Sequence, residues 1–125
     1  MKKKIKVGII GGGQLGMMLA EASSKLNIVP LVYSNTKDSP AAKVAKTYYG
    51  DFNDDKKIRK FISKVDLITY EFENIPYETL NEINKLKPVL PKPSVNRLIQ
   101  HRLAEKDFIN KLNIRTTRYV SIEKK

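Results

Sequence analysis

Short runs of apolar residues alternate with longer helical patterns along the 125 residues of this chain. The first run, residues 5–10, is rich in β-branched side chains, which is typical of a strand in a parallel sheet that helices cover on both faces. Beyond it, apolar residues recur on one face at the 3.6-residue period of a helix: Leu15, Met18, Leu19, Ala22 and Leu26. The pattern therefore predicts a strand followed directly by an amphipathic helix.

The same alternation continues to residue 112. It predicts further strands over residues 28–35, 47–50 and 65–70, a shorter one around Val89, and helices that begin near Ser39, Asn53, Pro76 and Ser94. This order is typical of an α/β fold, and we expect a Rossmann-like, three-layer domain over residues 1–112 with a mainly parallel sheet of four or five strands. Residues 113–125 turn extended, and we expect them to begin a linker or the first strand toward another domain.

A glycine-rich loop joins the first strand to the first helix. Gly11, Gly13 and Gly16 satisfy the pattern G-x-G-x-x-G, in which the glycines allow a tight turn, close approach of a ligand and close helix packing. The free N–H groups at the start of the helix favour an anion, although a tight connection without a ligand is the alternative. A dinucleotide site would also need Asp or Glu after the second strand, where residues 33–36 are Tyr, Ser, Asn and Thr.

Polar residues also follow the strand predicted at residues 65–70. Glu71, Glu73 and Asn74 come directly after it, and the carboxyl ends of parallel strands face the ligand crevice of an open α/β sheet. Alternation along an extended chain sends Glu71 and Glu73 to one side and Phe72 to the other. The alternative is that one of the two carboxylates caps the helix that begins at Pro76.

The composition narrows the possible functions. The net charge of +11 suggests nucleic acid, but the excess is shared by both halves of the chain and few of the 24 basic residues are Arg, which disfavours that partner. No apolar stretch approaches the roughly 18 residues of a membrane span. Together with the absence of Cys, this leads us to expect a cytoplasmic protein with no membrane partner. We interpret the carboxylates near Asn53 as helix caps and predict no metal site in the chain.

Several motifs in order resemble one family. The segments GGGQLG, SPAA, TYEFENIP, LPKPS and QHRLAEK are similar to the N-terminal domain of N5-carboxyaminoimidazole ribonucleotide synthases, which are ATP-grasp ligases of purine (IMP) biosynthesis. The resemblance implies a pre-ATP-grasp domain of an enzyme that uses ATP, Mg²⁺ and bicarbonate to carboxylate 5-aminoimidazole ribonucleotide. It also implies a cytoplasmic homodimer for the full-length enzyme. The ATP-grasp lobe, which holds the metal and most of the ATP in that family, has no counterpart in these residues.

The resemblance also assigns roles to individual residues. It implies that Gly13, Gln14 and Leu15 contact the ribonucleotide, that Glu73 holds its ribose hydroxyls beside Asn74, and that Arg102 contacts ATP. It places no catalytic residue in this chain, so we expect no activity and no tightly bound cofactor in the 125 residues alone.

The chain departs from the family pattern at Met17, at Ser34 and Asn35, and at Arg115, but neither the glycine loop nor Glu73 is affected. Two alternative functions stay open at this point. One is a small NAD-binding Rossmann module, and the other is a basic nucleic-acid-binding domain.

Overall fold

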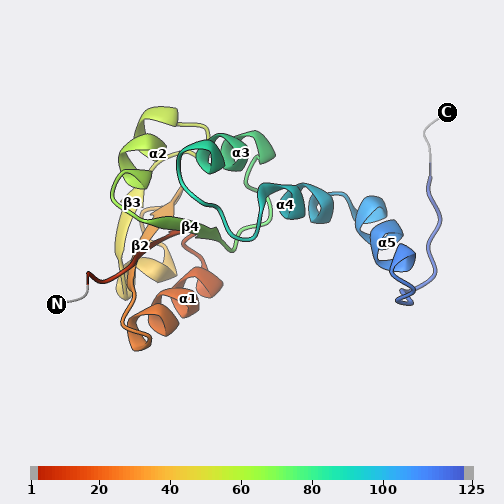
Figure 1. Ribbon diagram of the computed structural model, residues 1–125, viewed down its shortest axis with the longest axis horizontal. Coiled ribbons are helices and arrows are strands. Elements are labelled where there is room, and N and C mark those ends of the chain that lie inside the picture. The colour runs from red at the N-terminus through yellow and green to blue at the C-terminus, as the bar shows by residue number, and fades with distance from the viewer. Residues whose placement is uncertain (1–2, 123–125) are drawn as a thin grey trace.

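The computed structural model describes residues 3–122 and has a four-stranded parallel sheet in its N-terminal part, at the left of Figure 1. The strands are β1 (Lys6–Ile10), β2 (Val29–Ser34), β3 (Lys46–Tyr49) and β4 (Leu67–Tyr70), and their spatial order is β3-β2-β1-β4. Each neighbouring pair is parallel. The α/β class and the mainly parallel sheet expected from the sequence are confirmed.

The fifth strand expected around Val89 forms only a single bridge. Val89 pairs in parallel with Ile68 of β4, and the Ile68 N–H donates to the Pro88 carbonyl over 2.8 Å. The Leu90 N–H then donates back to the Ile68 carbonyl over 2.9 Å. The segment therefore lies along the outer edge of β4 without becoming a strand of its own.

Helices cover both faces of the sheet and give the domain its three layers. The helix α1 (Gln14–Lys25) and the short 3₁₀ helix η1 (Pro40–Lys43) lie on one face, and α2 (Asp55–Ile62) and α3 (Tyr77–Leu86) lie on the other (Figure 1). Alternation along the strands supplies each face with apolar side chains. The α1 side buries Val7, Ile9, Ala20, Val32 and Ala41, and the larger opposite side includes Ile10, Tyr33, Ile58, Phe61, Ile68 and Leu80.

The first helix packs through small residues and not through its apolar stripe. Gly16 and Ala20 are its buried positions, whereas Leu15, Met18 and Leu26 are each more than half exposed. A Cβ on Gly16 would overlap the carbonyl oxygen of Gly11, so helix and loop approach too closely for a side chain there. An amphipathic helix normally turns its stripe toward the core, and here the close approach demands small residues instead.

The predicted helix starts at Ser39 and Pro76 are confirmed as N-caps, and those near Asn53 and Ser94 need small corrections. The N-cap of α2 is Asp54, whose carboxylate accepts from the Lys57 N–H over 3.1 Å, and not Asn53. The face of α2 that meets the core carries Ile58, Phe61 and Ile62, which are buried. Asn27 lies just after α1 with φ 61°, in the left-handed conformation that ends helices.

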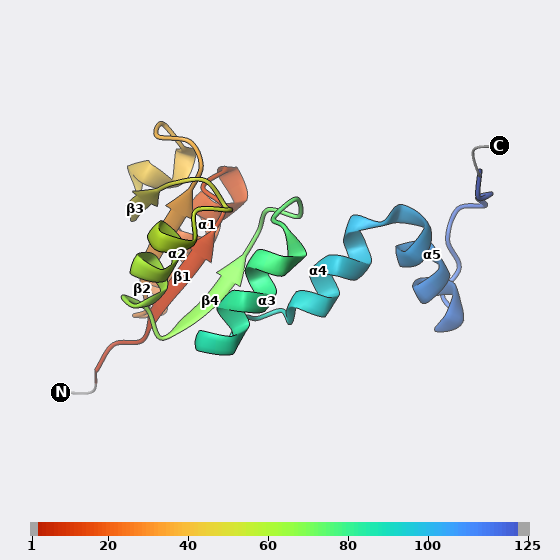
Figure 2. The same cartoon turned by 90° about the horizontal axis from the view of Figure 1, so that it is seen from above.

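The helical region at the C-terminal end is two helices. The helix α4 (Pro93–Gln100) begins at Pro93 and not after a Ser94 cap, and α5 (Arg102–Lys111) follows a break at His101. His101 caps α5 by accepting from the Ala104 N–H over 3.3 Å. Both helices lead away from the sheet (Figures 1 and 2), and α5 buries none of its residues within the described part of the chain.

Candidate functional site

The glycine loop lies at the carboxyl end of β1, in the middle of the sheet. The Gly11 N–H donates to the Tyr33 carbonyl over 3.0 Å, and Gly11 has φ 114°, a conformation that side chains disfavour. A Cβ on Gly12 would lie 2.7 Å from the hydroxyl oxygens of Ser34 and Ser39. The loop therefore continues β1 in close contact with the end of β2.

Glu71 closes the other side of this loop. Its N–H donates to the Ile10 carbonyl over 3.2 Å, so the backbone of Glu71 continues alongside β1 after β4 has ended. Its carboxylate accepts from the Gly13 N–H over 3.3 Å. A Cβ added to Gly11 would lie only 2.6 Å from the Oε1 atom of the same carboxylate. The alternative in which Glu71 caps the next helix is wrong, because Pro76 is the N-cap of α3 and no side chain described here caps that helix.

The electrostatics of Glu71 decide what the loop can bind. Burial raises the pKa of the Glu71 carboxyl, the Gly13 N–H opposes that rise, and the charge of Glu73 adds to it. A carboxylate already occupies the N–H group that an anion would use. A phosphate at the same position would meet a negative charge at close range. The loop therefore suits a ligand group that donates hydrogen bonds, such as a sugar hydroxyl, better than the anion that the glycine pattern first suggested.

A cleft of about 230 Å³ opens over the loop. Its lining comes from the carboxyl ends of β1, β2 and β4 and from the turn after β3: Gly11, Gly12, Gly13, Ser34, Asn35, Thr36, Phe52, Glu71 and Phe72. Phe52 and Phe72 stand together, with ring centroids 5.8 Å apart, and supply an apolar wall. The cleft thus combines an aromatic wall, a carboxylate and backbone groups at the carboxyl ends of the strands.

The end of β2 contributes residues whose role the sequence did not reveal. The Ser34 hydroxyl accepts from the Thr36 N–H over 3.1 Å and holds a tight turn beside the glycine loop. The buried Ser39 hydroxyl lies close by and has no hydrogen-bond partner among the described residues. In the sequence Ser34 counted only as the absence of an acidic residue, and Ser39 only as the start of a helix. A cluster of small hydroxyl residues after a buried strand is the signal that could have indicated them.

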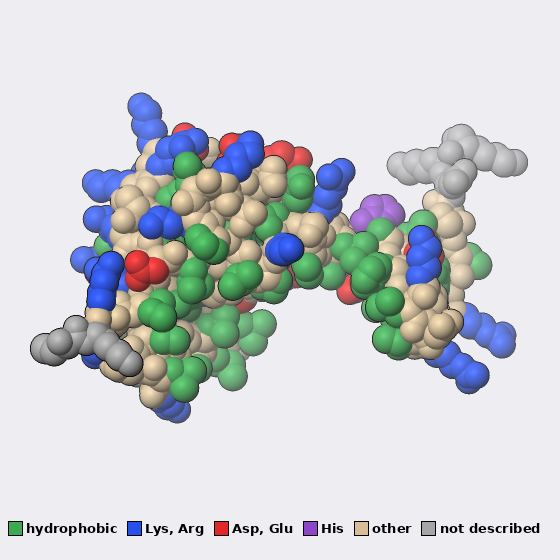
Figure 3. All heavy atoms as spheres, in the orientation of Figure 1, with side chains coloured by type: hydrophobic (Ala, Val, Ile, Leu, Met, Phe, Trp, Pro, Cys, Tyr) green, Lys and Arg blue, Asp and Glu red, His purple; other side chains and the backbone are tan. Residues whose placement is uncertain are grey.

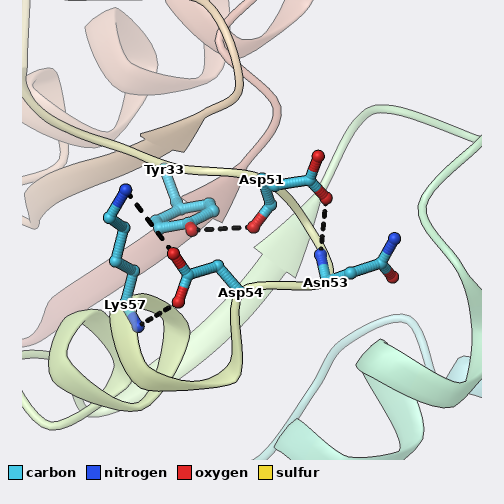
Figure 4. A network of polar contacts seen from close by, with 5 residues as sticks. All are labelled: Tyr33, Asp51, Asn53, Asp54 and Lys57. Atoms are coloured by element: carbon cyan, nitrogen blue, oxygen red, sulfur yellow. Dashed lines mark hydrogen bonds and ion pairs between the residues drawn. The ribbon is translucent and has the colours of Figure 1, made fainter.

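A polar network fixes the turn that carries Phe52 (Figure 4). The Tyr33 hydroxyl donates to the Asp51 carbonyl over 2.9 Å, and the Asp51 carboxylate accepts from the Asn53 N–H over 2.9 Å. Burial and then the nearby charges of Asp54 and Asp51 raise the pKa of Tyr33 to about 12, so the phenol stays protonated as a donor. The interpretation of Asp54 as a capping group is confirmed, and its ion pair with Lys57 spans 3.5 Å.

The structure brings only some of the predicted site residues together. Gly13 lines the cleft, while Gln14 and Leu15 begin α1 with exposed side chains outside the lining. Glu73 and Asn74 are exposed in the loop between β4 and α3, next to the cleft wall but not part of it.

The expected alternation of Glu71, Phe72 and Glu73 is wrong. Glu71 and Phe72 both line the cleft, whereas Glu73 does not. The strand ends at Tyr70, so the pleat that would have sorted these side chains does not reach them.

Arg102 lies apart from the cleft at the start of α5. Its guanidinium is exposed and forms an ion pair with Glu105 over 2.8 Å. In the described residues, no group of three or more His, Cys, Asp or Glu side chains is placed to hold a metal ion. Basic side chains do not gather in one patch on the face shown in Figure 3, where they lie at both ends of the molecule and along its upper edge.

Comparison with known proteins identifies the family. The family model of the ribonucleotide synthetase pre-ATP-grasp domain matches residues 2–100. This chain belongs to that family. The pre-ATP-grasp domain also accounts for the fold, because the parallel sheet and the glycine loop both lie within the matched residues.

Longer enzymes contain the same domain. The chain is 36% identical over 117 residues to the N5-carboxyaminoimidazole ribonucleotide synthase of Brucella melitensis. The matched region covers 93% of this chain and 32% of that enzyme. The crystal structure of N5-carboxyaminoimidazole synthetase from Staphylococcus aureus matches with a TM-score of 0.87 at 30% identity, over 99% of this chain and 34% of that one.

A second similar structure contains ligands. The N5-carboxyaminoimidazole synthase of Aspergillus clavatus, in complex with ADP and 5-aminoimidazole ribonucleotide, matches with a TM-score of 0.79 at 31% identity. The match covers 91% of this chain and 31% of that protein. The pre-ATP-grasp domain described here therefore spans about a third of the length of these relatives. Among residues 3–122, none of the helices has the length and apolar character that crossing a membrane would require.

Proposed function

We propose that this chain is the N-terminal substrate-binding domain of an N5-carboxyaminoimidazole ribonucleotide synthase. In the longer protein, ATP and bicarbonate would carboxylate the exocyclic amine of 5-aminoimidazole ribonucleotide, in the route to purines. The observation that carries the proposal is a cleft of suitable chemistry on this fold, at the carboxyl ends of the strands. Relatives that match nearly the whole chain are named for the same reaction, which supports the proposal.

The ribose is the part of the ribonucleotide that we assign to this cleft. Its vicinal hydroxyls are hydrogen-bond donors, and the carboxylates of Glu71 and Glu73 are acceptors. Glu73 and Asn74 are exposed on the loop beside the cleft wall, from which they could close over a bound sugar. Gly13, Gln14 and Leu15 would contact the ligand from the other side, at the start of α1. The negative charge of Glu71 directs the phosphate of the ribonucleotide away from the glycine loop.

ATP and Mg²⁺ belong, in this proposal, mainly to the part of the enzyme that the relatives have beyond these residues. Arg102 is the one group here that we assign to ATP, since its exposed guanidinium could leave Glu105 for a phosphate. We assign no Mg²⁺ ligand and no catalytic residue to the chain, and residues 113–125 would begin the connection to the ATP-grasp lobe. We further propose a cytoplasmic homodimer for the longer protein, which rests on the family resemblance alone.

Titration of 5-aminoimidazole ribonucleotide into the purified chain by calorimetry tests the assignment. Replacing Glu73 by Gln keeps the size of the side chain but removes its charge. Loss of a charge-assisted hydrogen bond costs about 1.5–3 kcal/mol, so the Kd should rise roughly ten- to a hundredfold. The matched control is Glu78→Gln, because Glu78 is an exposed carboxylate on α3 that lies outside the cleft over the glycine loop. Equal affinities for the wild type and the Glu73→Gln chain would contradict the role of Glu73, and no binding by the wild type would contradict the function.

A further inference from the structure

The loop between β4 and α3, residues 71–76, is held by a helix that follows it much later in the chain. The side-chain amide of Gln100, the last residue of α4, donates to the Glu73 carbonyl over 2.7 Å and to the Ile75 carbonyl over 2.7 Å. One turn earlier on α4, the fully buried Asn96 donates to the same Ile75 carbonyl over 3.1 Å. Two side chains of α4 thus fix the backbone of this loop.

The buried Ile75 and the partly buried Phe72 anchor this loop to the core, but the backbone at Glu73 and Asn74 has few other restraints. Its own internal backbone hydrogen bond runs from the Ile75 N–H to the Phe72 carbonyl and is long, at 3.4 Å. Glu73 and Asn74 are exposed, so packing does not hold them either. The Gln100 amide is therefore the strongest restraint on the backbone of Glu73 among the described contacts, and it acts from a residue 27 positions away.

We propose that Gln100 is a positioning residue for the ribonucleotide site. It would hold the backbone at Glu73 so that the carboxylate starts from a fixed place beside the cleft, which lowers the cost of ordering the loop when the ligand binds. The inference rests on the proposed function, because it concerns the same ligand. It adds a residue that does not touch the ligand, and this residue is only two positions from Arg102. The helix α4, which restrains the loop on the ribose side of the site, is therefore followed closely by Arg102, the residue that we assign to ATP.

The chemistry of the contact requires an amide donor at this position. Two carbonyl oxygens face one side-chain end, and the Nε2 group of Gln supplies two N–H donors to them. An ionised Glu in the same place has no donor and would put a negative charge against both oxygens. Gln100→Glu is therefore nearly isosteric and removes the restraint, and Gln100→Met removes the donors without adding charge.

The experiment compares three forms of the 125-residue chain with the wild type: Gln100→Glu, Gln100→Met and the control Arg97→Gln. Arg97 is on the same helix, and its guanidinium stacks on Tyr77 of α3 without contacting the loop carbonyls. The first measurement is the backbone order of residues 72–76 by ¹⁵N NMR relaxation. The second is the affinity for 5-aminoimidazole ribonucleotide, and the third is the midpoint of thermal unfolding.

For both Gln100 variants we expect loop order parameters to fall from about 0.85 to below about 0.6. The Kd for the ribonucleotide should rise about tenfold, and the unfolding midpoint should stay near that of the wild type, since Gln100 is exposed. Arg97→Gln should change neither loop order nor affinity. A residue that served stability alone would instead lower the midpoint and leave the affinity of the folded chain unchanged.

The outcomes separate this inference from the proposed function. If the wild type does not bind the ribonucleotide, the proposed function fails, and the loop order still reports whether Gln100 restrains the loop. If the wild type binds and both Gln100 variants keep its affinity, the positioning role is overturned. If Gln100→Glu does not fold, Gln100→Met alone gives the decision.

Discussion

Glu71 sets its carboxylate against the backbone of the glycine loop, where burial raises its pKa. A carboxyl whose pKa is higher in the folded chain than in the unfolded chain contributes stability that is fully present below the ordinary value of 4.5. That contribution is lost as the pH rises through the folded pKa. At neutral pH the charge of Glu71 therefore lowers the free energy of unfolding. The charged carboxylate is nevertheless the hydrogen-bond acceptor that stands beside the glycine loop.

Replacing Glu71 by Gln should make this cost visible. The Gln oxygen can still accept from the Gly13 N–H, so the change mainly removes the charge. We expect the variant to gain stability over the wild type as the pH rises from about 4.5 to 7, by less than about 1 kcal/mol because the site is partly open to water. Urea unfolding at several pH values measures the difference. A variant that lost stability over this range, compared with the surface change Glu78→Gln, would contradict the assigned direction.

At the residue scale the sequence could predict which stretch forms the site better than which side chain enters it. Both Glu71 and Glu73 are predicted to follow a strand, and that position is confirmed. Which of them faces the glycine loop depends on where the pleat ends, and Tyr70 ends it one residue before Glu71. Ser34 and Ser39 were missed because their hydroxyls act through a turn and a close approach, which a pattern of apolar residues does not record.

The packing of α1 shows the same limit for a whole element. Periodicity placed the helix correctly, but most of the predicted apolar face is exposed, and the side that meets the sheet is the side with Gly16 and Ala20. Close contact between a helix and the loop that precedes it selects small residues, and this requirement outweighs the burial of Leu15 and Met18. The third glycine of the loop pattern was the available signal, because its role is close packing of helix on strand.

Gly16→Ala tests how tightly α1 is packed. Alanine favours a helix over glycine by about 1 kcal/mol, but its Cβ would overlap the Gly11 carbonyl oxygen, and such overpacking costs roughly 1–3 kcal/mol. Since the overlap is with backbone, which yields less than a side chain, we expect a net loss of about 1–2 kcal/mol in the free energy of unfolding. The control is Met18→Ala on the exposed face of the same helix, which should change stability by less than about 0.5 kcal/mol. Equal stabilities of the Gly16→Ala chain and the wild type would show that the loop can move away.

For the whole molecule, the alternation of apolar runs and helical patterns was enough to predict the α/β class and the parallel sheet. The path of α4 and α5 away from that sheet was not predictable in the same way. Val95 and Ile99 give α4 an apolar stripe, yet both are exposed, because no layer of the domain lies over them in the described residues. The sequence pattern reports that a stripe exists and does not say which surface covers it.

We expect the purified chain not to catalyse the carboxylation that we propose for the longer protein. Phosphoryl transfer depends on charge neutralisation by Mg²⁺, and the described residues contain no cluster of ligands for a metal. Arg102 alone can contact a phosphate but cannot position ATP against bicarbonate. We therefore expect no bicarbonate-dependent release of ADP from the purified 125 residues in a coupled assay. Turnover that persisted after repeated purification would show that the domain holds catalytic groups of its own.

The short segment beside β4 has a consequence for how the domain behaves at high concentration. Unpaired strand edges can recruit strands from other chains, which leads to aggregation. The backbone of Pro88 and Leu90 already occupies the outer edge of β4 at Ile68. The opposite edge is β3, which has four residues and begins with Lys46, a charge that opposes edge pairing. Neither side of the sheet therefore offers a long, uncharged template for another strand, which disfavours the growth of fibrils from the folded domain.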